Sequence, residues 1–166
     1  MHFFALVFTE KDGILDDVME PYGSNACERI PEEYLEFVPC GEEGEDGGCE
    51  RCPRRGDAAC FGWWENPDAE WDWYACGKEE GSRWGDPLVL RDGSRAAHAS
   101  VGDVVWDEVA LEEAECCVVL TPYGMWHEFD RLICDAEARR ENAAWVMEHV
   151  AAADPSWEAY AVDCHI

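Results

Sequence analysis

Cysteines are the residues of this sequence that most directly suggest chemistry. Cys49 and Cys52 form a CxxC motif, with Cys40 before it and Cys60 after it. A CxxC motif supplies two soft ligands from one tight turn, and zinc takes four such ligands in a tetrahedron. Cys40, Cys49, Cys52 and Cys60 are therefore a candidate structural zinc site, although their spacing is irregular and no second CxxC follows.

Tryptophans and carboxylates concentrate in residues 62–85. After the Asn66-Pro67-Asp68 turn, tryptophans alternate with polar or phenolic residues over residues 71–76, which is the period of a strand. In one interpretation the indoles of this strand fill the core, since buried aromatic side chains dominate core energetics. In the other they form a recognition platform, made of Trp71, Trp73, Arg83 and Trp84.

Histidines beside carboxylates are the residues that could act as general bases. His127 is followed by Glu128, and His165 lies two residues after Asp163. A carboxylate fixes the tautomer of a histidine that accepts a proton, so such a pair could form at one end of a sheet. A histidine in a strand is more commonly structural. The sequence contains no P-loop, nucleophile elbow, HExxH or Rossmann fingerprint, so we find no catalytic residue and no enzyme signature.

The charge of the chain is its most unusual global property. The 166 residues include 38 acidic and 12 basic ones, for a formal net charge of −26, yet 48% are hydrophobic and nine are tryptophan. This is the composition of a folded acidic protein rather than of a disordered acidic tail. Direct nucleic-acid binding is disfavoured, because it depends on lysine and arginine neutralising phosphates. Adaptation of a whole proteome to high salt would also give such a charge.

Carboxylates can also stand in for phosphates. A protein that presents a DNA-like negative potential would bind the basic groove of another protein, and salt would weaken that binding. Two clusters of carboxylates are candidates for such partner binding, one in residues 40–60 and one among the tryptophans. The candidates are Glu42, Glu43, Glu45, Asp46, Glu65, Asp68, Glu70 and Asp72.

Several motifs carry a resemblance to a known family. The string ENPDAEWDWYACG, followed by Arg83-Trp84-Gly85, resembles the W-E-N-P-N-A-K-W-D-W-Y-x-x-G-G-R-W signature of a family of small uncharacterised bacteriophage and prophage proteins. The opening FALVFTEKDGILDDVMEPYG, the segment VLTPYGMWHEF and the terminal AVDCHI are also similar to that family, whose C-terminus is V-D-C-H-I-like. The loop at residues 77–82 departs from it, because the family has only Gly-Gly before Arg-Trp. The resemblance implies a phage-type origin and names no activity.

Hydrophobic periodicity gives the order of the elements. An uninterrupted apolar run predicts a first strand, helical spacing that ends at Asp154-Pro155 predicts a long helix, and alternation near the C-terminus predicts a strand with one buried face. Predicted strands cover residues 2–9, 71–76, 88–90, 116–121, 125–129 and 159–166, and predicted helices cover residues 14–20, 31–37 and 131–153.

This order predicts an α+β fold. We expect a single domain over residues 1–166, with a mixed or antiparallel sheet and helices on one face, in a ferredoxin-like split βαβ arrangement. Residues 40–60 are rich in cysteine, glycine and acidic residues and predict a surface insert. No basic leader and no apolar run of spanning length is present, so we expect a soluble protein that stays in the host cytoplasm.

Two functions from different classes follow from these features. The first is a phage-type, anti-CRISPR-like inhibitor that occupies a basic nucleic-acid-binding groove of a host defence nuclease or CRISPR effector as a DNA mimic. The alternative is a protein that binds a small molecule, in which a nucleotide signal stacks on the tryptophan and arginine platform, or a zinc-dependent protein. A structural zinc is the only cofactor that the sequence suggests, and neither a membrane nor a nucleic acid is an expected partner.

Overall fold

The computed structural model describes residues 1–24, 30–39, 62–79, 82–107 and 115–166. The chain divides into two compact units. The first unit comprises residues 1–19 and 73–166, and the second comprises residues 20–72. The predicted single domain over residues 1–166 stays a prediction, and the predicted insert at residues 40–60 lies outside the described residues.

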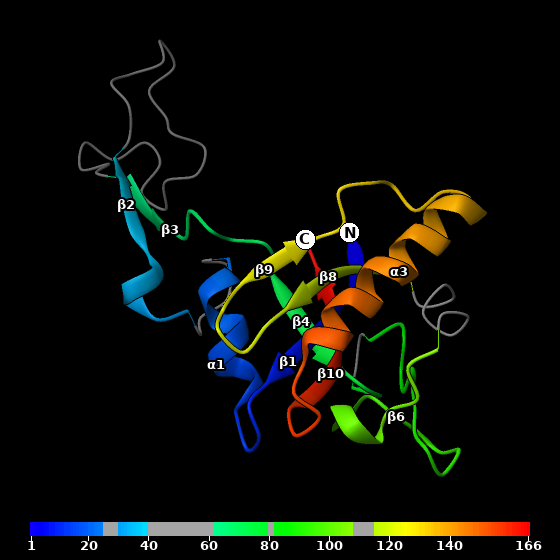
Figure 1. Cartoon of the computed structure of the whole chain (residues 1–166). Helices are drawn as coiled ribbons and strands as arrows, with labels where there is room; N and C mark the ends of the chain where they lie inside the picture. Colours follow the sequence, from blue (N-terminus) through cyan, green and yellow to red (C-terminus); the bar gives the residue numbers. More distant parts are fainter. Residues whose placement is uncertain (25–29, 40–61, 80–81, 108–114) are drawn as a thin grey trace. The chain divides into compact units, whose positions relative to one another are not determined.

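A six-stranded sheet forms the centre of the first unit (Figure 1). Its strands follow the order β4-β10-β1-β8-β9, and β7 pairs with β10 beside β4. The strands are β1 (His2–Thr9), β4 (Trp73–Cys76), β7 (His98–Ser100), β8 (Cys116–Leu120), β9 (Trp126–Glu128) and β10 (Glu158–His165).

Pairing in this sheet is mixed. β1 runs parallel to β8 and antiparallel to β10, while β9 and β4 pair antiparallel with β8 and β10. The predicted α+β class with a mixed sheet is confirmed. The strand order differs from the ferredoxin-like split arrangement, because β1 and β8 are direct parallel neighbours and no strand separates them.

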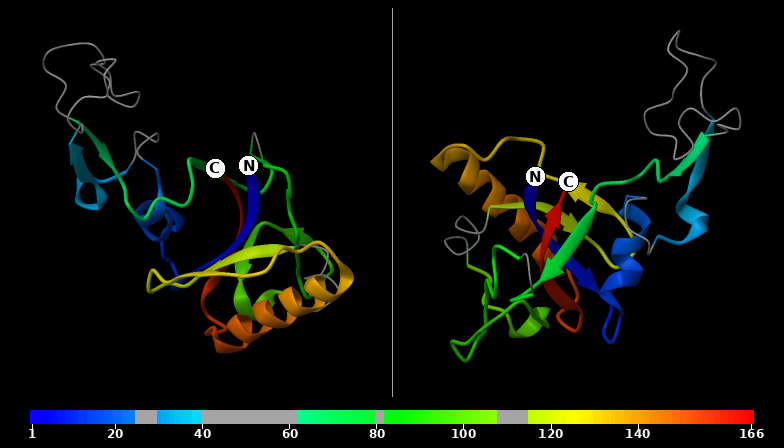
Figure 2. Two further views of the ribbon diagram at one scale, coloured as in Figure 1. Left: turned by 90° about the horizontal axis from the view of Figure 1, so that it is seen from above. Right: turned by 180° about the vertical axis from the view of Figure 1, so that it is seen from behind.

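In the described part of the first unit, two helices lie on opposite sides of the sheet. Residues 4–9 of β1 are all buried, so both faces of this central strand are covered. Figure 2 shows α1 (Leu15–Met19) on the side of the sheet away from α3 (Ala136–Ala152). The prediction of helices on one face was therefore wrong. The prediction of a single buried face for the last strand was wrong for the same reason, because residues 161–164 of β10 are all buried.

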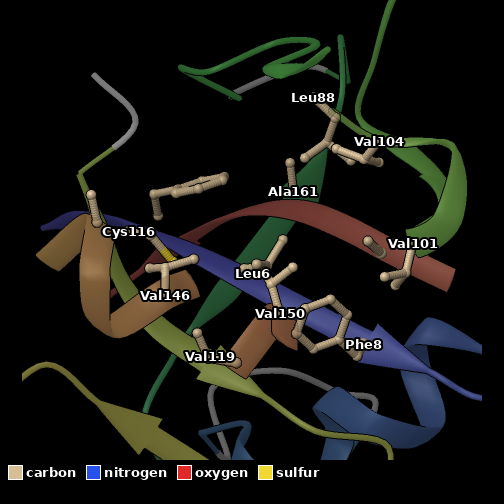
Figure 3. Packing of buried hydrophobic residues seen from close by; sticks show 13 residues of the cluster. Leu6, Phe8, Leu88, Val101, Val104, Cys116, Val119, Val146, Val150 and Ala161 are labelled. Atoms are coloured by element: carbon tan, nitrogen blue, oxygen red, sulfur yellow. The ribbon is translucent and has the colours of Figure 1, made fainter. Parts of the chain in front are cut away.

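The main core lies between the sheet and α3 (Figure 3). Phe4, Leu6 and Phe8 point to one side of β1 because alternate residues of a strand share a face. Val146 and Val150 of α3 pack against that face. Each large side chain buried in this way contributes roughly 1.5–3 kcal/mol to the free energy of folding.

The helix α3 begins later than the hydrophobic pattern predicts. Its N-cap is Asp135, whose side chain accepts a hydrogen bond from the Ala138 N–H at 2.8 Å. Leu132, which the prediction placed inside the helix, precedes the cap and is 85% exposed. A capping carboxylate therefore sets the start of this helix, and the apolar residues before it do not.

The described part of the first unit also contains short elements. They are the two-stranded sheet of β5 (Leu88–Val89) and β6 (Arg95–Ala96), and the 3-10 helix η3 (Val101–Asp103). The second unit contains the 3-10 helices η1 (Glu20–Tyr22) and η2 (Glu32–Tyr34), and the antiparallel strands β2 (Glu36–Pro39) and β3 (Gly62–Glu65). The predicted helix over residues 31–37 is thus one short turn followed by a strand. Among the described residues, no helix has the length and apolar character needed to cross a membrane.

Candidate functional site

The predicted partner-binding carboxylates divide into two groups. Glu42, Glu43, Glu45 and Asp46 lie outside the described residues, as do the predicted zinc ligands Cys40, Cys49, Cys52 and Cys60. Glu65, Asp68, Glu70 and Asp72 all belong to the second unit. Glu65 accepts a hydrogen bond from the Trp63 indole N–H at 2.8 Å, and Asp72 accepts one from the Ser24 hydroxyl at 2.8 Å.

The described part of the second unit carries negative charge without positive charge. Neither lysine nor arginine occurs among its described residues, whereas eight carboxylates do. These carboxylates are Glu20, Glu32, Glu33, Glu36, Glu65, Asp68, Glu70 and Asp72. Each is at least partly accessible to solvent. Among these described residues, the charge of the eight carboxylates is therefore not offset by any lysine or arginine.

An aromatic pair is exposed on the sheet formed by β2 and β3. Phe37 and Trp64 are directly opposite in the antiparallel register, and their ring centroids are 5.4 Å apart. They are 45% and 54% exposed. Large aromatic side chains in contact with each other are normally buried, so this exposed pair is a candidate anchor for another molecule.

Two glutamates oppose each other on the other face of the same sheet. The register pairs Glu36 with Glu65, one position along from Phe37 and Trp64. Side chains alternate between faces, so the glutamate pair and the aromatic pair point to opposite sides. Directly opposed like charges destabilise a strand pair. An approaching cation would remove this repulsion.

Asn66 fixes the turn that follows β3. Its amide nitrogen donates to the carbonyl oxygens of Pro21 at 2.7 Å and Gly23 at 2.9 Å, and its side-chain oxygen accepts from the Asp68 N–H at 3.0 Å. The predicted turn at residues 66–68 is thereby confirmed. A Cβ atom added at Gly23 would lie 2.0 Å from Ile30 and 2.9 Å from Trp71, so this close approach requires glycine.

The predicted platform residues do not form one surface within either unit. Trp71 belongs to the second unit and is only 5% exposed. Trp73 stacks on His165 with centroids 5.2 Å apart, and Trp84 packs against Phe4 at 5.7 Å, both in the first unit. Arg83 is exposed there. Of the predicted platform, only Trp84 and the residues around it therefore remain a candidate binding surface.

A histidine and a buried aspartate contact each other in the first unit. His2 Nδ1 lies 2.8 Å from an oxygen of Asp163, whose side chain is fully buried. The other oxygen of Asp163 accepts from the Arg83 backbone N–H at 2.7 Å. The Asp163 carboxylate therefore joins the His2 ring and the backbone of Arg83.

Asp163 belongs to the predicted histidine–carboxylate pair, but its histidine partner is His2 and not the predicted His165. His2 and His165 are directly opposite in the β1–β10 register, and Asp163 lies diagonally across from His2 on the same face. His165 instead stacks on Trp73 and meets the His2 ring edge-on at 5.0 Å. The signal that could have found His2 is its position in the first strand, once that strand is paired with the last one.

A cleft of about 530 Å³ lies beside this pair. It is lined by aromatic residues, by acidic residues and by the segment that precedes α3. The lining residues are His2, Phe3, Phe4, Trp84, Glu115, Cys117, Glu128, Phe129, Asp130, Arg131, Leu132 and Ile133. Burial raises the pKa of the Cys117 thiol, and the nearby Glu115 and Glu128 carboxylates raise it further. Cys117 is therefore a protonated thiol at neutral pH and a poor nucleophile.

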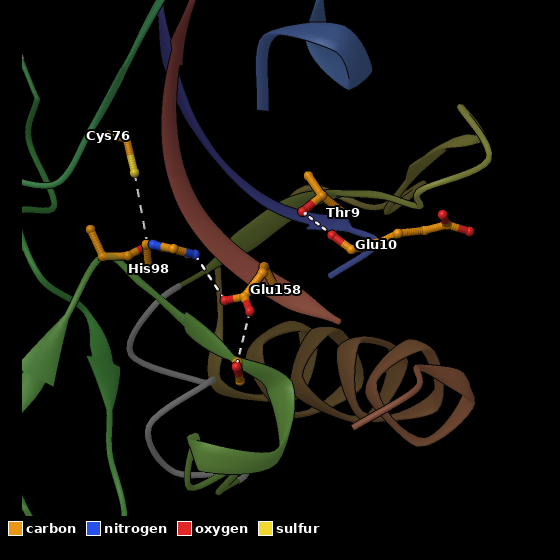
Figure 4. Close-up of polar contacts among 7 residues, drawn as sticks. Thr9, Glu10, Cys76, His98 and Glu158 are labelled. Atoms are coloured by element: carbon orange, nitrogen blue, oxygen red, sulfur yellow. Dashed lines mark hydrogen bonds and ion pairs between the residues drawn. The ribbon is translucent and has the colours of Figure 1, made fainter. Parts of the chain in front are cut away.

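A second histidine–carboxylate contact lies at the opposite end of β10 (Figure 4). His98 Nε2 is 2.9 Å from one oxygen of Glu158, whose other oxygen accepts from the Ser100 hydroxyl at 3.0 Å. The carboxylate thus lies between the imidazole and the hydroxyl. A serine nucleophile needs the imidazole next to it, so this arrangement is a surface hydrogen-bond network. The His98 ring also stacks on Tyr160 at 4.1 Å.

The histidine of the predicted His127–Glu128 pair has a different neighbour. His127 packs against His149 of α3 with ring centroids 4.7 Å apart, while Glu128 accepts from the Trp126 indole at 3.0 Å. Cys116 and Cys117 point to opposite faces of β8, with Cys116 fully buried. Within the described ranges, no group of three or more histidine, cysteine or acidic residues could hold a metal ion.

Comparisons of the chain with protein-family models, with curated proteins and with solved structures find no match. The similarity of its motifs to the phage and prophage family therefore stays a prediction.

Proposed function

We propose that this protein is an acidic binding protein whose second unit occupies the basic nucleic-acid-binding groove of another protein. The observation that carries the proposal is the set of eight carboxylates without a lysine or arginine in the described part of that unit. A groove lined by lysine and arginine would attract such a surface over a distance of a Debye length, about 8 Å at physiological salt. The carboxylates then take the place of phosphates.

The β2–β3 sheet suits a groove because both of its faces carry contacts. A groove has two walls, and a two-stranded ribbon inserted between them meets both. Phe37 and Trp64 offer apolar area to one wall, while Glu36 and Glu65 offer charge to the other. Aromatic anchors contribute much of the affinity of protein interfaces, and charges contribute mainly to association rate and specificity.

The repulsion between Glu36 and Glu65 supports a role of these residues in binding a partner, since it does not stabilise the strand pair. Two like charges in direct opposition weaken the strand pair, and among the described residues of this unit no lysine or arginine relieves them. Local sequence choices that oppose stability are commonly found where a residue serves binding. A cationic side chain from the partner, placed near both carboxylates, would convert the repulsion into attraction.

The resemblance to phage proteins directs the choice of partner. A phage protein that mimics DNA would act in the host cytoplasm, and a defence nuclease or CRISPR effector offers the basic groove that the charge requires. We therefore propose an anti-CRISPR-like inhibitor as the function. A pull-down from a bacterial host lysate is the first step, followed by binding measurements on purified CRISPR effectors and defence nucleases.

The decisive experiment is a competition. Binding of the protein to a purified effector is measured between about 0.05 M and 0.5 M salt, with and without duplex DNA. We expect the duplex and the protein to exclude each other, and the affinity to fall steeply as salt rises. Simultaneous binding of duplex and protein, or an affinity that does not depend on salt, would contradict DNA mimicry.

Matched variants locate the contact. The double variant Glu36→Gln, Glu65→Gln keeps the side-chain shapes, and we expect it to bind the effector about tenfold more weakly. Trp64→Ala removes the aromatic anchor and is expected to weaken binding by a similar factor. The control is Glu137→Gln combined with Glu148→Gln, two exposed carboxylates of α3 in the first unit. Equal losses in the control and the test variants would assign the effect to net charge alone.

The cleft next to Trp84 supports the second candidate function, a small-molecule binding protein. Its volume of about 530 Å³ lies in the range of small-ligand sites. Its acidic lining residues Glu115, Glu128 and Asp130 disfavour the phosphates of a nucleotide signal. Thermal-shift measurements with nucleotides, run beside zinc analysis of the purified protein, test this alternative. Stabilisation by a nucleotide would favour it over mimicry.

A further inference from the structure

The cleft of the first unit has aromatic walls. Phe3, Phe4, Trp84 and Phe129 all line it, and Trp84 is held against Phe4 with ring centroids 5.7 Å apart. Aromatic faces are electron-rich and attract cations. A flat cation can also stack on an indole face. The walls therefore favour a ligand that is planar, positively charged or both.

The polar groups that the cleft offers are hydrogen-bond acceptors. Glu128 and Asp130 are exposed carboxylates on its lining. Glu128 uses one oxygen for the Trp126 indole and keeps the other. Glu115, the third carboxylate, is already paired with Arg139 at 2.6 Å. A ligand that fits this set must donate hydrogen bonds.

Arg131, the arginine on the lining, pairs with carboxylates that lie outside the cleft. Arg131 forms an ion pair with Glu141 of α3, and a second nitrogen lies 3.7 Å from Asp135. Its charge is thus largely matched by two carboxylates that do not line the cleft. The remaining charge on the lining is negative, from Glu128 and Asp130.

We propose that this cleft binds a guanidinium group. A guanidinium is planar, carries only donors, is weakly hydrated and stacks on aromatic faces, so it suits the aromatic walls and the Glu128 and Asp130 carboxylates. An ammonium group shares the charge but is compact and strongly hydrated, and it does not stack. The guanidinium could belong to a free alkylguanidine or to an arginine side chain of a protein. The proposal does not depend on DNA mimicry, because the cleft belongs entirely to the first unit.

Nuclear magnetic resonance detects such binding at the proposed position. The ¹⁵N-labelled protein is titrated with N-acetyl-arginine methylamide, and the indole N–H signal of Trp84 is assigned by its absence in Trp84→Phe. We expect this signal to shift with saturation, while the indole signal of Trp157, which does not line the cleft, stays in place. The citrulline analogue has the same shape without the charge, and we expect it to bind at least about tenfold more weakly.

Exposed side chains test the electrostatics without disturbing the core. Glu128→Gln and Asp130→Asn each remove a negative charge from an acceptor, and each is expected to weaken the binding of the arginine probe about three- to tenfold. Arg131→Gln removes a charge of the same sign as the probe, so it is expected to strengthen the binding of the probe. Glu137→Gln lies on α3 away from the lining and serves as the control, with affinity unchanged.

Two further probes distinguish the source of the guanidinium. Agmatine represents a free alkylguanidine, and a blocked Gly-Arg-Gly peptide represents an arginine side chain. Tighter binding of either one supports the shared chemistry and identifies the source. Equal affinity for the citrulline and arginine analogues, or unchanged affinity in both Glu128→Gln and Asp130→Asn, would overturn the proposal.

Discussion

At the scale of single residues, buried polar side chains decide local geometry in both units. Asn66 joins three backbone groups of the second unit through its amide, and it is 6% exposed. Asp163 does the same in the first unit by accepting from the His2 ring and the Arg83 backbone. A buried polar group without partners costs about 1–3 kcal/mol. Both residues therefore specify one arrangement of the segments around them.

His149 makes the stability of the protein depend on pH. Burial lowers the pKa of His149 below its ordinary value of 6.5, and the neighbouring His127 lowers it further. Glu148 opposes this shift by raising the pKa. The folded protein consequently binds fewer protons than the unfolded chain just below pH 6.5. The contribution of neutral His149 to the free energy of unfolding is fully present above pH 6.5, and it declines as the pH falls through 6.5.

We predict that His149→Gln makes the protein less sensitive to acid. Between pH 7 and pH 5 the wild type should lose more unfolding free energy than the variant, by less than about 1 kcal/mol because His149 is half-buried and solvent screens its charge. Urea denaturation at several pH values measures the difference. An identical pH dependence in both proteins would show that His149 does not contribute, and His127→Gln should give a smaller effect in the same direction.

At the scale of elements, a side-chain cap determines where the helix α3 begins. α3 starts at Asp135 because this carboxylate accepts the Ala138 N–H, and the same hydrogen bond lowers the pKa of Asp135. Carboxylates in the first turn also interact favourably with the helix dipole, and Glu137 lies there. The apolar residues before the cap line the cleft instead of extending the helix.

We predict that Asp135→Ala destabilises the first unit by removing this cap. The melting temperature should fall by about 3 °C, the usual size of a lost N-cap in a chain of this length. Asp135→Ser keeps a capping oxygen and should retain most of the stability. Thermal unfolding followed by circular dichroism at 222 nm measures both variants. Equal melting temperatures for Asp135→Ala and the wild type would show that the cap does not hold the helix.

At the scale of the whole molecule, the net charge of −26 opposes compaction. Like charges that are spread over a folded surface repel each other, and salt screens this repulsion. The Debye length falls from about 30 Å at 0.01 M salt to about 3 Å at 1 M. The folded chain should therefore be more stable at high salt than at low salt, in contrast to its proposed binding, which salt weakens.

We predict that the melting temperature rises with sodium chloride over this range. The increase should be several degrees, roughly the effect of 1–2 kcal/mol for a chain of this size. Sodium and potassium chloride should act alike, because screening depends on ionic strength and not on the identity of the ion. A melting temperature that is constant or falls with salt would contradict net repulsion as a limit on stability.

Local patterns in the sequence determined many of the elements. The first strand has the predicted bounds, β8 and β9 lie within the strands predicted at residues 116–121 and 125–129, and the turn at residues 66–68 closes through Asn66 as its residue type implies. These features depend on neighbours a few positions apart, so the chain specifies them locally. The acidity of the second unit is likewise a property of the sequence alone.

Only the tertiary structure decided which distant residues meet. The β1–β10 pairing brings His2 to Asp163 across 161 positions, and the parallel β1–β8 pair replaces the expected split arrangement. The β2–β3 register opposes Glu36 to Glu65 and exposes Phe37 beside Trp64. Strand register follows from which faces are buried across the whole sheet. That information belongs to the packed molecule and not to any one stretch of the chain.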